Sequence, residues 1–343
     1  MLSKPIVSVL MPVHNVESTI CECLESILAQ TVSNFEMVVV DDGSSDSSRI
    51  ILEDYATHEK RIKLICTEQQ GIVKALNLGL KNCNGNYIAR MDGDDVMHPQ
   101  RLEQQIEFLK QDPSLDLIGC LVEGIPQTTN YQQWSNSLTT NQAIREEIFV
   151  ESPIMHPTFF AKHELFEKIG GYCAHPWAED YDFLLRAYQF NIQFGKVQEY
   201  LVKKRDSPTR LSRVDWRYKR PAMFEAKVHY FLKMGFLKGK KGVVIAGTGP
   251  SGRKIASIFQ KQNIPILGFV DNRPGPPDRT VMDIPAYGFT ENQLEENLPD
   301  FFLELFKNAL IISAVGNEAG RSHLQQSLTI AAPCITARLI RFI

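Results

Sequence analysis

The stretch Ala89-Arg90-Met91-Asp92-Gly93-Asp94-Asp95 places three carboxylates at the end of a short apolar segment, residues 87–91. An apolar run that stops at Asp and Gly is typical of a buried β-strand followed by a turn. The same junction occurs earlier, where the apolar run 35–40 stops at Asp41-Asp42-Gly43-Ser44. The two junctions together predict a sheet with an acidic edge.

Strand-like and helix-like segments alternate along the first 120 residues. This alternation predicts a doubly wound α/β sheet with helices on both faces. Ligands in such sheets bind at the carboxyl ends of the strands, so the two acidic loops should meet at one edge. We predict strands at 6–11, 35–40, 62–66 and 87–91, and helices at 16–30, 45–58, 71–80 and 99–110.

The five carboxylates of these two loops would repel one another unless a cation neutralised them. Hard oxygen ligands without a nearby His or Cys cluster suit Mg²⁺ or Mn²⁺ holding a diphosphate. The alternative interpretation is that Asp and Gly only form the turns that follow strands. Because two clusters occur on one predicted sheet, we favour the metal site.

Six motifs follow one another between residues 5 and 215: Pro12-Val13-His14-Asn15, Asp41-Asp42-Gly43-Ser44, Gly71-x-x-x-Ala75-Leu76-Asn77-x-Gly79, Ala89–Asp95, Met155-His156-Pro157-Thr158 and Trp177-Ala178-Glu179-Asp180-Tyr181-Asp182. In this order they resemble the motifs of family 2 glycosyltransferases with the GT-A fold. The resemblance implies a GT-A-type mixed sheet and an inverting transfer of a sugar from a nucleotide-sugar donor, by family habit a UDP-sugar. The acceptor would be a hydroxyl in the biosynthesis of a cell-surface polysaccharide or glycan.

The resemblance also assigns a role to each matching residue. Displacement at an anomeric carbon needs the charge of the leaving diphosphate neutralised and the proton of the incoming hydroxyl removed. The implied residues are, for catalysis, Asp180 as the base with Glu179 beside it; for the acceptor, His156 and Trp177; for Mn²⁺ or Mg²⁺, Asp92 and Asp94; and for the donor, Pro12, His14, Asn15, Asp41, Asp42, Asn77, Arg90, Asp92 and Arg205.

Structural roles compete with some of these assignments. His156 also suits the end of a strand, and Asp180 suits the N-cap of a helix that is expected to start near Tyr181. Asp182 is more typical of support for that helix's first turn than of chemistry. Trp177 suits either the core or a stacking platform for a sugar ring.

Composition and charge narrow the class of protein. The chain has 343 residues, of which 43% are hydrophobic, and is long enough for two domains. A net charge of −3 argues against general nucleic-acid binding. Seven scattered cysteines predict a reducing compartment, and no apolar run approaches the ~20 residues that span a bilayer. We therefore expect a cytoplasmic protein.

Residues 203–241 carry thirteen Lys or Arg and three acidic residues. Such a segment suits an anionic partner or a position against the acidic site. The resemblance implies a mobile loop here, whose basic residue closes over the pyrophosphate, and Arg pairs well with phosphate. Arg205 is the best match by position and Arg210 the next. A solvated charged linker is the alternative.

A further helix is expected at 221–234, where apolar residues alternate with basic ones. Packing against the transferase domain is one use for it. The other is to lie on an anionic membrane surface, where a lipid-linked acceptor would be found. The sequence leaves open a glycan or a lipid-linked acceptor, a purely cytoplasmic location or peripheral attachment to the inner face of the membrane, and the oligomeric state.

The last third of the chain begins after Gly239-Lys240-Lys241-Gly242, which is typical of a linker, so we predict domains at 1–238 and 239–343. A strand at 243–246 leads into Gly247-Thr248-Gly249-Pro250-Ser251-Gly252 and a helix, and the next strand ends in Asp271. This is the Rossmann-like dinucleotide fingerprint in its strand–turn–helix setting. The candidate nucleotide-binding residues are Gly247, Gly249, Gly252 and Asp271.

This smaller α/β domain resembles the nucleotide- or sugar-nucleotide-binding domains of bacterial polysaccharide-biosynthesis proteins, and the run from Gly268 to Asn272 is part of the likeness. A strand at 310–314 with a turn at 315–317 fits the same fold. Pro250 lacks an N–H that would otherwise point at a phosphate. A domain that binds nothing is therefore the alternative.

Other function classes explain fewer of these residues. An NAD(P)-dependent oxidoreductase, or a regulatory protein that binds sugar nucleotides, would use only the C-terminal fingerprint and leave the acidic loops without a role. A nucleotidyltransferase needs a Gly-rich basic loop where this chain has Pro12-Val13-His14-Asn15. A scaffold without activity would bind nucleotide-sugar equally well after Asp94→Ala.

Overall fold

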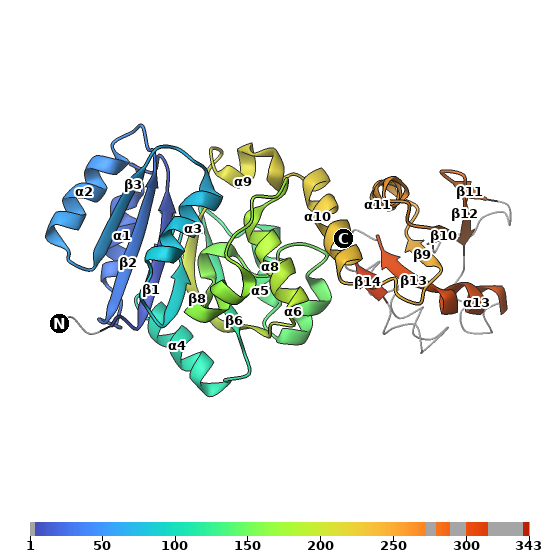
Figure 1. Ribbon diagram of the computed structural model, residues 1–343, viewed down its shortest axis with the longest axis horizontal. Helices are drawn as coiled ribbons and strands as arrows, with labels where there is room; N and C mark the ends of the chain where they lie inside the picture. Colours follow the sequence, from blue (N-terminus) through green and yellow to red (C-terminus); the bar gives the residue numbers. More distant parts are fainter. Residues whose placement is uncertain (1–3, 272–278, 289–299, 315–338, 343) are drawn as a thin grey trace. The chain divides into compact units, whose positions relative to one another are not determined.

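The computed structural model describes residues 4–271, 279–288, 300–314 and 339–342. The chain folds into two compact units, Met1–Arg145 with Ser152–Tyr218, and Glu146–Glu151 with Lys219–Ile343. Each unit is built around its own sheet (Figure 1). Asn272, the turn expected at 315–317, and Cys334 lie outside the described residues.

From residue 4 onwards the first unit contains eight strands: β1 (Val7–Val13), β2 (Phe35–Asp42), β3 (Ile62–Thr67), β4 (Tyr87–Arg90), β5 (Val96–Met97), β6 (Leu117–Ile125), β7 (Phe160–Lys162) and β8 (Phe194–Arg205). They form one sheet in the order β3-β2-β1-β4-β7-β6-β8-β5. The strands β1 to β4 run parallel to one another, as the alternation predicts. Because β7 is antiparallel to both β4 and β6, the whole sheet is mixed.

The helices of this unit are α1 (Ile20–Leu28), α2 (Ser48–His58), α3 (Ile72–Asn82), α4 (Arg101–Gln111), α5 (Asn130–Ser137), α6 (Asn141–Glu147), which runs past the unit boundary, η1 (His156–Thr158), α7 (His163–Ile169), α8 (Glu179–Gln189), α9 (Leu211–Val214) and η2 (Trp216–Tyr218). The four strands and four helices predicted from the alternation are confirmed. The largest difference is at α1, which starts at Ile20 rather than at Val16. The N–H of Val16 donates to Ser48 Oγ at 2.8 Å, and Asn15 has a positive φ of 53°, so the chain is still a loop there.

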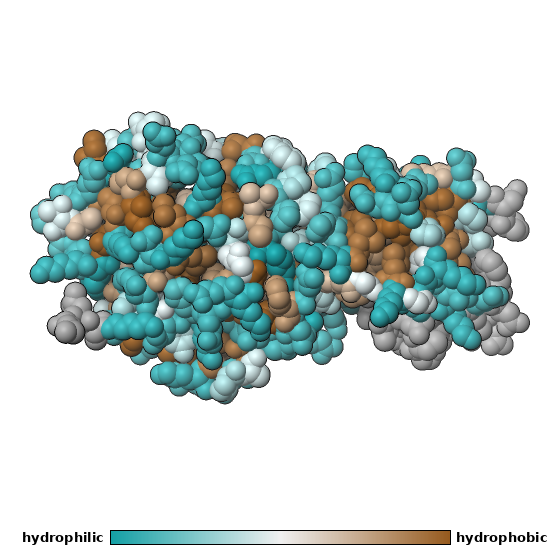
Figure 2. Space-filling model, in the orientation of Figure 1, coloured by the Kyte–Doolittle hydropathy of each residue, from teal (hydrophilic) through white to brown (hydrophobic). Residues whose placement is uncertain are grey.

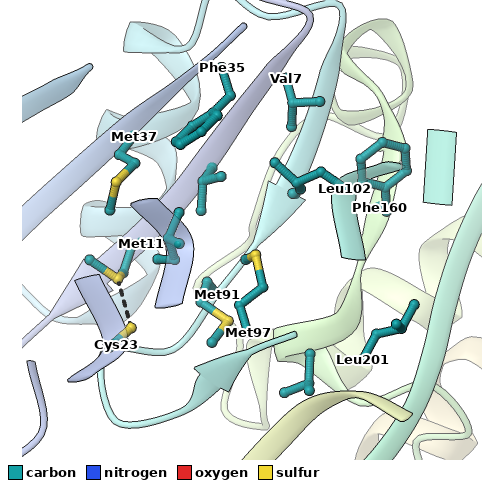
Figure 3. Packing of buried hydrophobic residues seen from close by; sticks show 14 of the residues in the cluster. Val7, Met11, Cys23, Phe35, Met37, Met91, Met97, Leu102, Phe160 and Leu201 are labelled. Carbon is teal, nitrogen blue, oxygen red and sulfur yellow. Dashed lines mark hydrogen bonds between the residues drawn. The ribbon is translucent and has the colours of Figure 1, made fainter. Parts of the chain in front are cut away.

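The core cluster of the first unit lies between the mixed sheet, from β2 to β8, and helices that include α1 and α4 (Figure 3). Met11 on β1 and Met37 on β2 are fully buried, as is Cys23 on α1. The Cys23 thiol contacts the Met11 sulfur at 3.6 Å. Free cysteine often serves as a small hydrophobic core residue, and Cys23 does so here. Parallel strands covered on both faces explain why these segments read as continuous apolar runs.

In its described residues the second unit contains six strands: β9 (Gly242–Ala246), β10 (Ile266–Asp271), β11 (Thr280–Val281), β12 (Ile284–Gly288), β13 (Ala309–Ser313) and β14 (Leu339–Arg341). Their order is β11-β12-β10-β9-β13-β14, and among these strands only β11 is antiparallel to its neighbour. The helices are α10 (Arg220–Lys233), α11 (Pro250–Lys261) and α13 (Asp300–Asn308). This is the smaller α/β unit that the C-terminal fingerprint predicts.

Helix α10 belongs to this second unit, so the units divide after Tyr218 and not at the predicted boundary after residue 238. The reason is aromatic packing, because the ring of Phe231 on α10 stacks on Phe259 of α11 at 5.6 Å. The buried ammonium of Lys227 donates to the carbonyls of Val150 and Phe342, at 2.7 and 3.0 Å. The apolar side chains of α10 are therefore used for packing within this unit.

No helix in the described part of the chain is both long and apolar enough to cross a membrane. Hydrophilic side chains are spread over the visible surface, with apolar ones between them (Figure 2). Apolar atoms on a folded surface are ordinary, and they indicate no lipid contact by themselves.

The glycine loop after β9 provides a matched pair of substitutions. A Cβ on Gly252 would lie 2.0 Å from the carbonyl oxygen of Gly247, whereas a Cβ on Gly249 would meet nothing within 4 Å. Gly249 also has a φ of −71°, which any residue adopts. We expect Gly252→Ala to destabilise the second unit by about 2 kcal/mol or more, because the backbone must move apart, and Gly249→Ala to leave stability unchanged. Calorimetric unfolding of the full chain measures this, and equal effects of the two variants would contradict it.

Candidate active site

Three carboxylates lie on the loop between β4 and β5. Ligand oxygens of Asp92, Asp94 and Asp95 all lie within 4.8 Å of one another. Asp95 is fully buried, whereas the Asp92 side chain is 22% exposed. An all-oxygen set of this kind fits Mg²⁺ or Mn²⁺. The expected pair is thus joined by a third candidate ligand, Asp95, which the motif resemblance does not assign to the metal.

Basic side chains compensate the charge of this loop. Buried Arg90 forms an ion pair with Oδ1 of Asp92. The Lys204 ammonium lies 3.1 Å from Oδ2 of Asp92 and 3.3 Å from Oδ2 of Asp95. Burial would raise the pKa of Asp92, but Arg90 and Lys204 outweigh it and hold this pKa well below its usual range. Burial and the other two carboxylates raise the pKa of Asp95 to about 7, although Lys204 opposes them.

Arg101 on α4 is hydrogen-bonded to the backbone of Arg90. Its Nη2 donates to the Arg90 carbonyl at 2.9 Å, and its Nε donates to Oε1 of Gln105 at 2.9 Å. Gln105 in turn donates to the carbonyl of Thr158 on η1 at 3.0 Å. Complete burial lowers the pKa of Arg101 to about 10. The sequence carries no local signal for this chain of hydrogen bonds, because the residues that form it come from three separate segments.

Arg205 fastens the acidic loop to the end of β8. Its backbone N–H donates to Oδ1 of Asp95 at 2.8 Å, and its Nε donates to the carbonyl of Asp94 at 3.0 Å. Its Nη2 also donates to Glu22 at 2.6 Å. Arg210 stands at the start of α9, and its charge opposes burial in setting the pKa of all three loop carboxylates. Both basic residues expected at the pyrophosphate are therefore near the acidic loop.

The loops after β1 and β2 are joined by hydrogen bonds. Nδ1 of His14 lies 3.0 Å from the carbonyl of Asp42. The side-chain oxygen of Asn15 accepts the N–H of Ser45 at 2.8 Å. Pro12, which is expected to bind the donor, lies within β1 and is paired with Val40. His14 and Asn15 thus line the edge of the sheet where β1 ends.

The two carboxylates at the end of β2 differ in their contacts. Asp42 accepts the N–H groups of Gln70 and Gly71, at 2.7 and 2.8 Å, just before α3. Asp41 is fully buried, and its Oδ1 accepts the N–H of Ser44 at 3.3 Å. Its Oδ2 has no hydrogen-bond partner in the part of the chain that the structure describes. A buried, unsatisfied carboxylate oxygen is costly unless a ligand donates to it.

Asn77 uses its whole side-chain amide on the backbone of Tyr172. Its Nδ2 donates to the Tyr172 carbonyl at 2.8 Å, and its Oδ1 accepts the Tyr172 N–H at 2.9 Å. The Tyr172 hydroxyl lies 2.8 Å from Nε2 of buried His156. Burial, together with the charge of Arg90, lowers the pKa of His156 well below its usual value, so this ring is neutral.

The start of α8 carries Glu179 and Asp180. The hydroxyl of Tyr218 lies 2.8 and 2.6 Å from the two carboxylate oxygens of buried Glu179. Burial and the neighbouring Asp180 raise the pKa of Glu179 to about 7. Asp180 is half-buried, and its Oδ1 accepts the N–H of Tyr181 at 2.7 Å. The helix begins at Glu179 with Ala178 as its N-cap residue, so Asp180 lies within the first turn and is not the cap.

Trp177 and Asp182 belong to one buried cluster. The indole N–H of Trp177 donates to Oδ1 of Asp182 at 2.9 Å, and Nε of Arg186 donates to Oδ2 at 2.8 Å. The Trp177 side chain is 6% exposed, and its ring stacks on His175 at 4.8 Å. The supporting role expected for Asp182 agrees with these contacts. Trp177 is thus buried, whereas another tryptophan of this unit, Trp216 on η2, is 61% exposed to solvent.

The buried Arg90 links the two halves of the site. Its charge opposes burial in setting the pKa of Asp92 on the acidic loop and of Glu179 on α8. It adds to burial in lowering the pKa of His156. Its Nε makes no hydrogen bond within the described ranges. The residues predicted for the metal and for the acceptor side therefore share one electrostatic centre.

Comparison with known proteins shows which family this chain resembles. Residues 8–170 match Glycosyl transferase family 2. An uncharacterized glycosyltransferase, EpsJ of Bacillus subtilis, is 30% identical over 252 residues, which cover 67% of this chain and 71% of the relative. The amylovoran biosynthesis glycosyltransferase AmsE of Erwinia amylovora is 28% identical and is covered over 89% of its length, with 68% of this chain. The O-antigen biosynthesis glycosyltransferase WbnJ of Escherichia coli is 31% identical over 58% of this chain and 79% of its own.

Solved structures show the same fold. S. aureus TarS 1-349 in complex with UDP-GlcNAc superposes with a TM-score of 0.56 at 22% identity, over 68% of this chain and 66% of that one. The longer TarS chain gives a TM-score of 0.54 at 22% identity over 68% of this chain, and this chain spans 40% of its length. The likeness confirms the expected GT-A-type mixed sheet; the second, smaller α/β unit is seen in the structure itself.

The raised pKa of Glu179 makes the stability of the first unit depend on pH. An unfolded glutamate titrates near pH 4.3, whereas buried Glu179 titrates at about 7. The folded state therefore binds the proton more tightly, and the stability that this gives is lost as pH rises from about 4.5 to 7. Glu179→Gln, which still accepts from Tyr218, should raise the free energy of unfolding by on the order of 2 kcal/mol at pH 8 and change it little at pH 4.5.

Urea unfolding at the two pH values measures this difference. Asp95 titrates in the same direction in both proteins, so its contribution cancels. Glu123→Gln is the control, because the Glu123 side chain is 53% exposed to water. A constant difference between Glu179→Gln and the wild type across this pH range would contradict the assignment.

Proposed function

Because the chain belongs to glycosyltransferase family 2, we propose that it transfers a sugar from a UDP-sugar to a hydroxyl of a glycan or lipid-linked acceptor, with inversion. We also propose that this reaction serves the synthesis of a cell-surface polysaccharide. The names of AmsE and WbnJ support the second proposal, and the UDP-GlcNAc in a TarS complex supports the nucleotide. The observation that carries the proposal is the cluster of carboxylates after β4, in which ligand oxygens of Asp92, Asp94 and Asp95 lie within 4.8 Å of one another and Arg90 pairs with Asp92.

Donor binding is proposed at the ends of β1, β2 and β4. The unsatisfied Oδ2 of Asp41 is suited to accept an N–H of the nucleobase, while Asp42 orders the loop before α3. The unpaired Nε of Arg90 is suited to donate to a ligand oxygen. Asp94, with Asp92 and Asp95, would hold Mn²⁺ or Mg²⁺, which neutralises the charge that develops on the leaving diphosphate. Arg210 would add a bidentate donor to the phosphates.

Acceptor activation is proposed at the start of α8. Both oxygens of Glu179 lie within hydrogen-bond distance of the Tyr218 hydroxyl, so we assign the base to half-buried Asp180 and a positioning role to Glu179. One carboxylate base with no carboxylate nucleophile gives a single displacement with inversion. A stacking platform for the acceptor must be accessible, which favours Trp216 over Trp177.

The second unit is proposed as an accessory binding module. Asp271 accepts both the N–H and the hydroxyl of Thr248 within the glycine loop, so its Oδ2 already serves the loop itself. This observation weakens the oxidoreductase alternative, in which that acid would hold a ribose. Nucleotide binding by Gly247, Gly249 and Gly252 stays a prediction, which Gly249→Ala tests, since that variant keeps the loop geometry but obstructs a ligand.

Nucleotide binding should depend on the acidic loop. We expect calorimetric titration of the full chain with UDP to show binding that Mn²⁺ strengthens at least about tenfold. Asp94→Ala should remove the metal effect, and Asp41→Asn should weaken binding by about tenfold through loss of the buried acceptor charge. Asp116→Ala, a carboxylate on a distant loop before β6, is the control. UDP binding that ignores both Mn²⁺ and Asp94 would refute the donor site.

Transfer should depend on Asp180 without a change in donor binding. We expect Asp180→Asn to lower kcat by about 10²–10⁴-fold, because the incoming hydroxyl keeps its proton. Its affinity for UDP with Mn²⁺ should match that of the wild type. A screen of UDP-sugars with glycan acceptors, read by UDP release and by NMR of the product anomer, measures both rate and stereochemistry. A retained anomeric configuration would contradict the single displacement.

A further inference from the structure

Lys204 occupies an unusual position for a lysine at the end of a strand. It is the penultimate residue of β8 and is 8% exposed. Its ammonium lies between the acidic residues of the β4–β5 loop, 3.1 Å from Oδ2 of Asp92 and 3.3 Å from Oδ2 of Asp95. A buried ammonium between two carboxylates replaces part of the charge that a bound divalent cation would supply.

The three loop carboxylates are not equally available to a metal. Asp92 is paired with Arg90 through Oδ1 and with Lys204 through Oδ2. Asp95 is paired with Lys204 through Oδ2, and its Oδ1 accepts the backbone N–H of Arg205. Within the described ranges no ion pair engages the Asp94 carboxylate. A metal that also uses Asp92 or Asp95 must therefore compete with the Lys204 ammonium.

We propose that Lys204 is a built-in counter-ion that competes with the divalent cation for the acidic loop, so that metal binds strongly only together with the nucleotide diphosphate. This inference rests on the proposed donor site and adds a binding order to it. In the free protein, Lys204 neutralises Asp92 and Asp95 and weakens metal binding. When a diphosphate arrives, its negative charge offers the flexible ammonium new oxygen partners, and the carboxylates become available to the cation.

A second consequence concerns nucleotide binding without metal. Because Lys204 already brings a positive charge to the loop, the diphosphate meets a partly neutralised surface. Part of the affinity for UDP should therefore persist when all divalent cations are chelated. Removal of the ammonium should make nucleotide binding depend more strongly on metal.

The chain offers a matched control in the neighbouring residue. Lys203 is on the same strand, but successive side chains of a strand point to opposite faces. Its side chain is 58% exposed and lies 3.6 Å from Glu123. Lys203→Met and Lys204→Met remove the same charge from adjacent positions, and methionine keeps a similar length and an uncharged, flexible stem.

The experiment is a calorimetric titration of the full chain with Mn²⁺ in the absence of nucleotide. We expect Lys204→Met to bind Mn²⁺ about tenfold or more tightly than the wild type, because the competing charge is gone. Lys203→Met and Lys204→Arg should resemble the wild type. Equal Mn²⁺ affinity of Lys204→Met and the wild type, or an equal gain in Lys203→Met, overturns the proposal.

A second titration uses UDP with excess chelator. Lys204→Met should lose at least about tenfold in UDP affinity under these conditions and recover when Mn²⁺ is in excess. No loss in Lys204→Met relative to Lys203→Met overturns this part. If Asp94→Ala abolishes the metal effect on UDP while the Lys204 variants behave as the wild type, the donor site stands and this inference fails. If no protein binds UDP, the donor site fails, and the Mn²⁺ titration still decides the role of Lys204. Thermal unfolding of each variant shows that it is folded.

Discussion

The ion pair between Arg90 and Asp92 is the constraint on which the rest of the site depends. A guanidinium that is 2% exposed must be paired, because an uncompensated buried charge costs several kcal/mol. Arg90 is fixed by its strand, by the carbonyl of Phe159 that accepts its N–H, and by Arg101 behind it. Its charge then acts on the acidic loop, on the His156 pair and on the start of α8. The acidic loop and the start of α8, the two parts of the proposed site, thus share the charge of one buried side chain.

Much of the first unit could be predicted from the sequence because the signals are local. The runs that form β1 to β4 are apolar and end at polar turns, and their order along the chain already implies parallel pairing. The antiparallel strand β7 could not be predicted, since three residues carry no useful periodicity. The glycines near residue 240 lead to a predicted boundary that is too late in the chain. Phe231 of α10 packs on Phe259 of α11, so α10 belongs to the second unit.

The candidate site also contains residues that the sequence indicates and residues that it does not. Asp92, Asp94 and Asp180 stand out in the sequence as candidates because they lie in motifs next to strand or helix ends, and their roles stay predictions. Lys204 is not singled out by its motif, since a Lys-Lys-Arg run does not say which side chain faces inwards. The alternation of side chains along a strand does indicate that Lys204 points to the opposite face from Lys203 and Arg205. The charge of the acidic loop then favours a basic residue on the face that meets it. Arg101 and Tyr218 offer none, because they reach the site only through the tertiary fold.

The contact between Asn77 and Tyr172 joins two parts of the chain that lie far apart in the sequence. One side-chain amide pairs with both backbone groups of a residue 95 positions away, as a neighbouring strand would. The interval that it closes contains the acidic loop, β6 and η1. Because the entropy of closing a loop grows only slowly with its length, an insertion in a surface loop of this interval, such as residues 126–129, would weaken the closure little. The amide of Asn77 therefore keeps α3 attached to the segment before α8 even where the loops between them change in length.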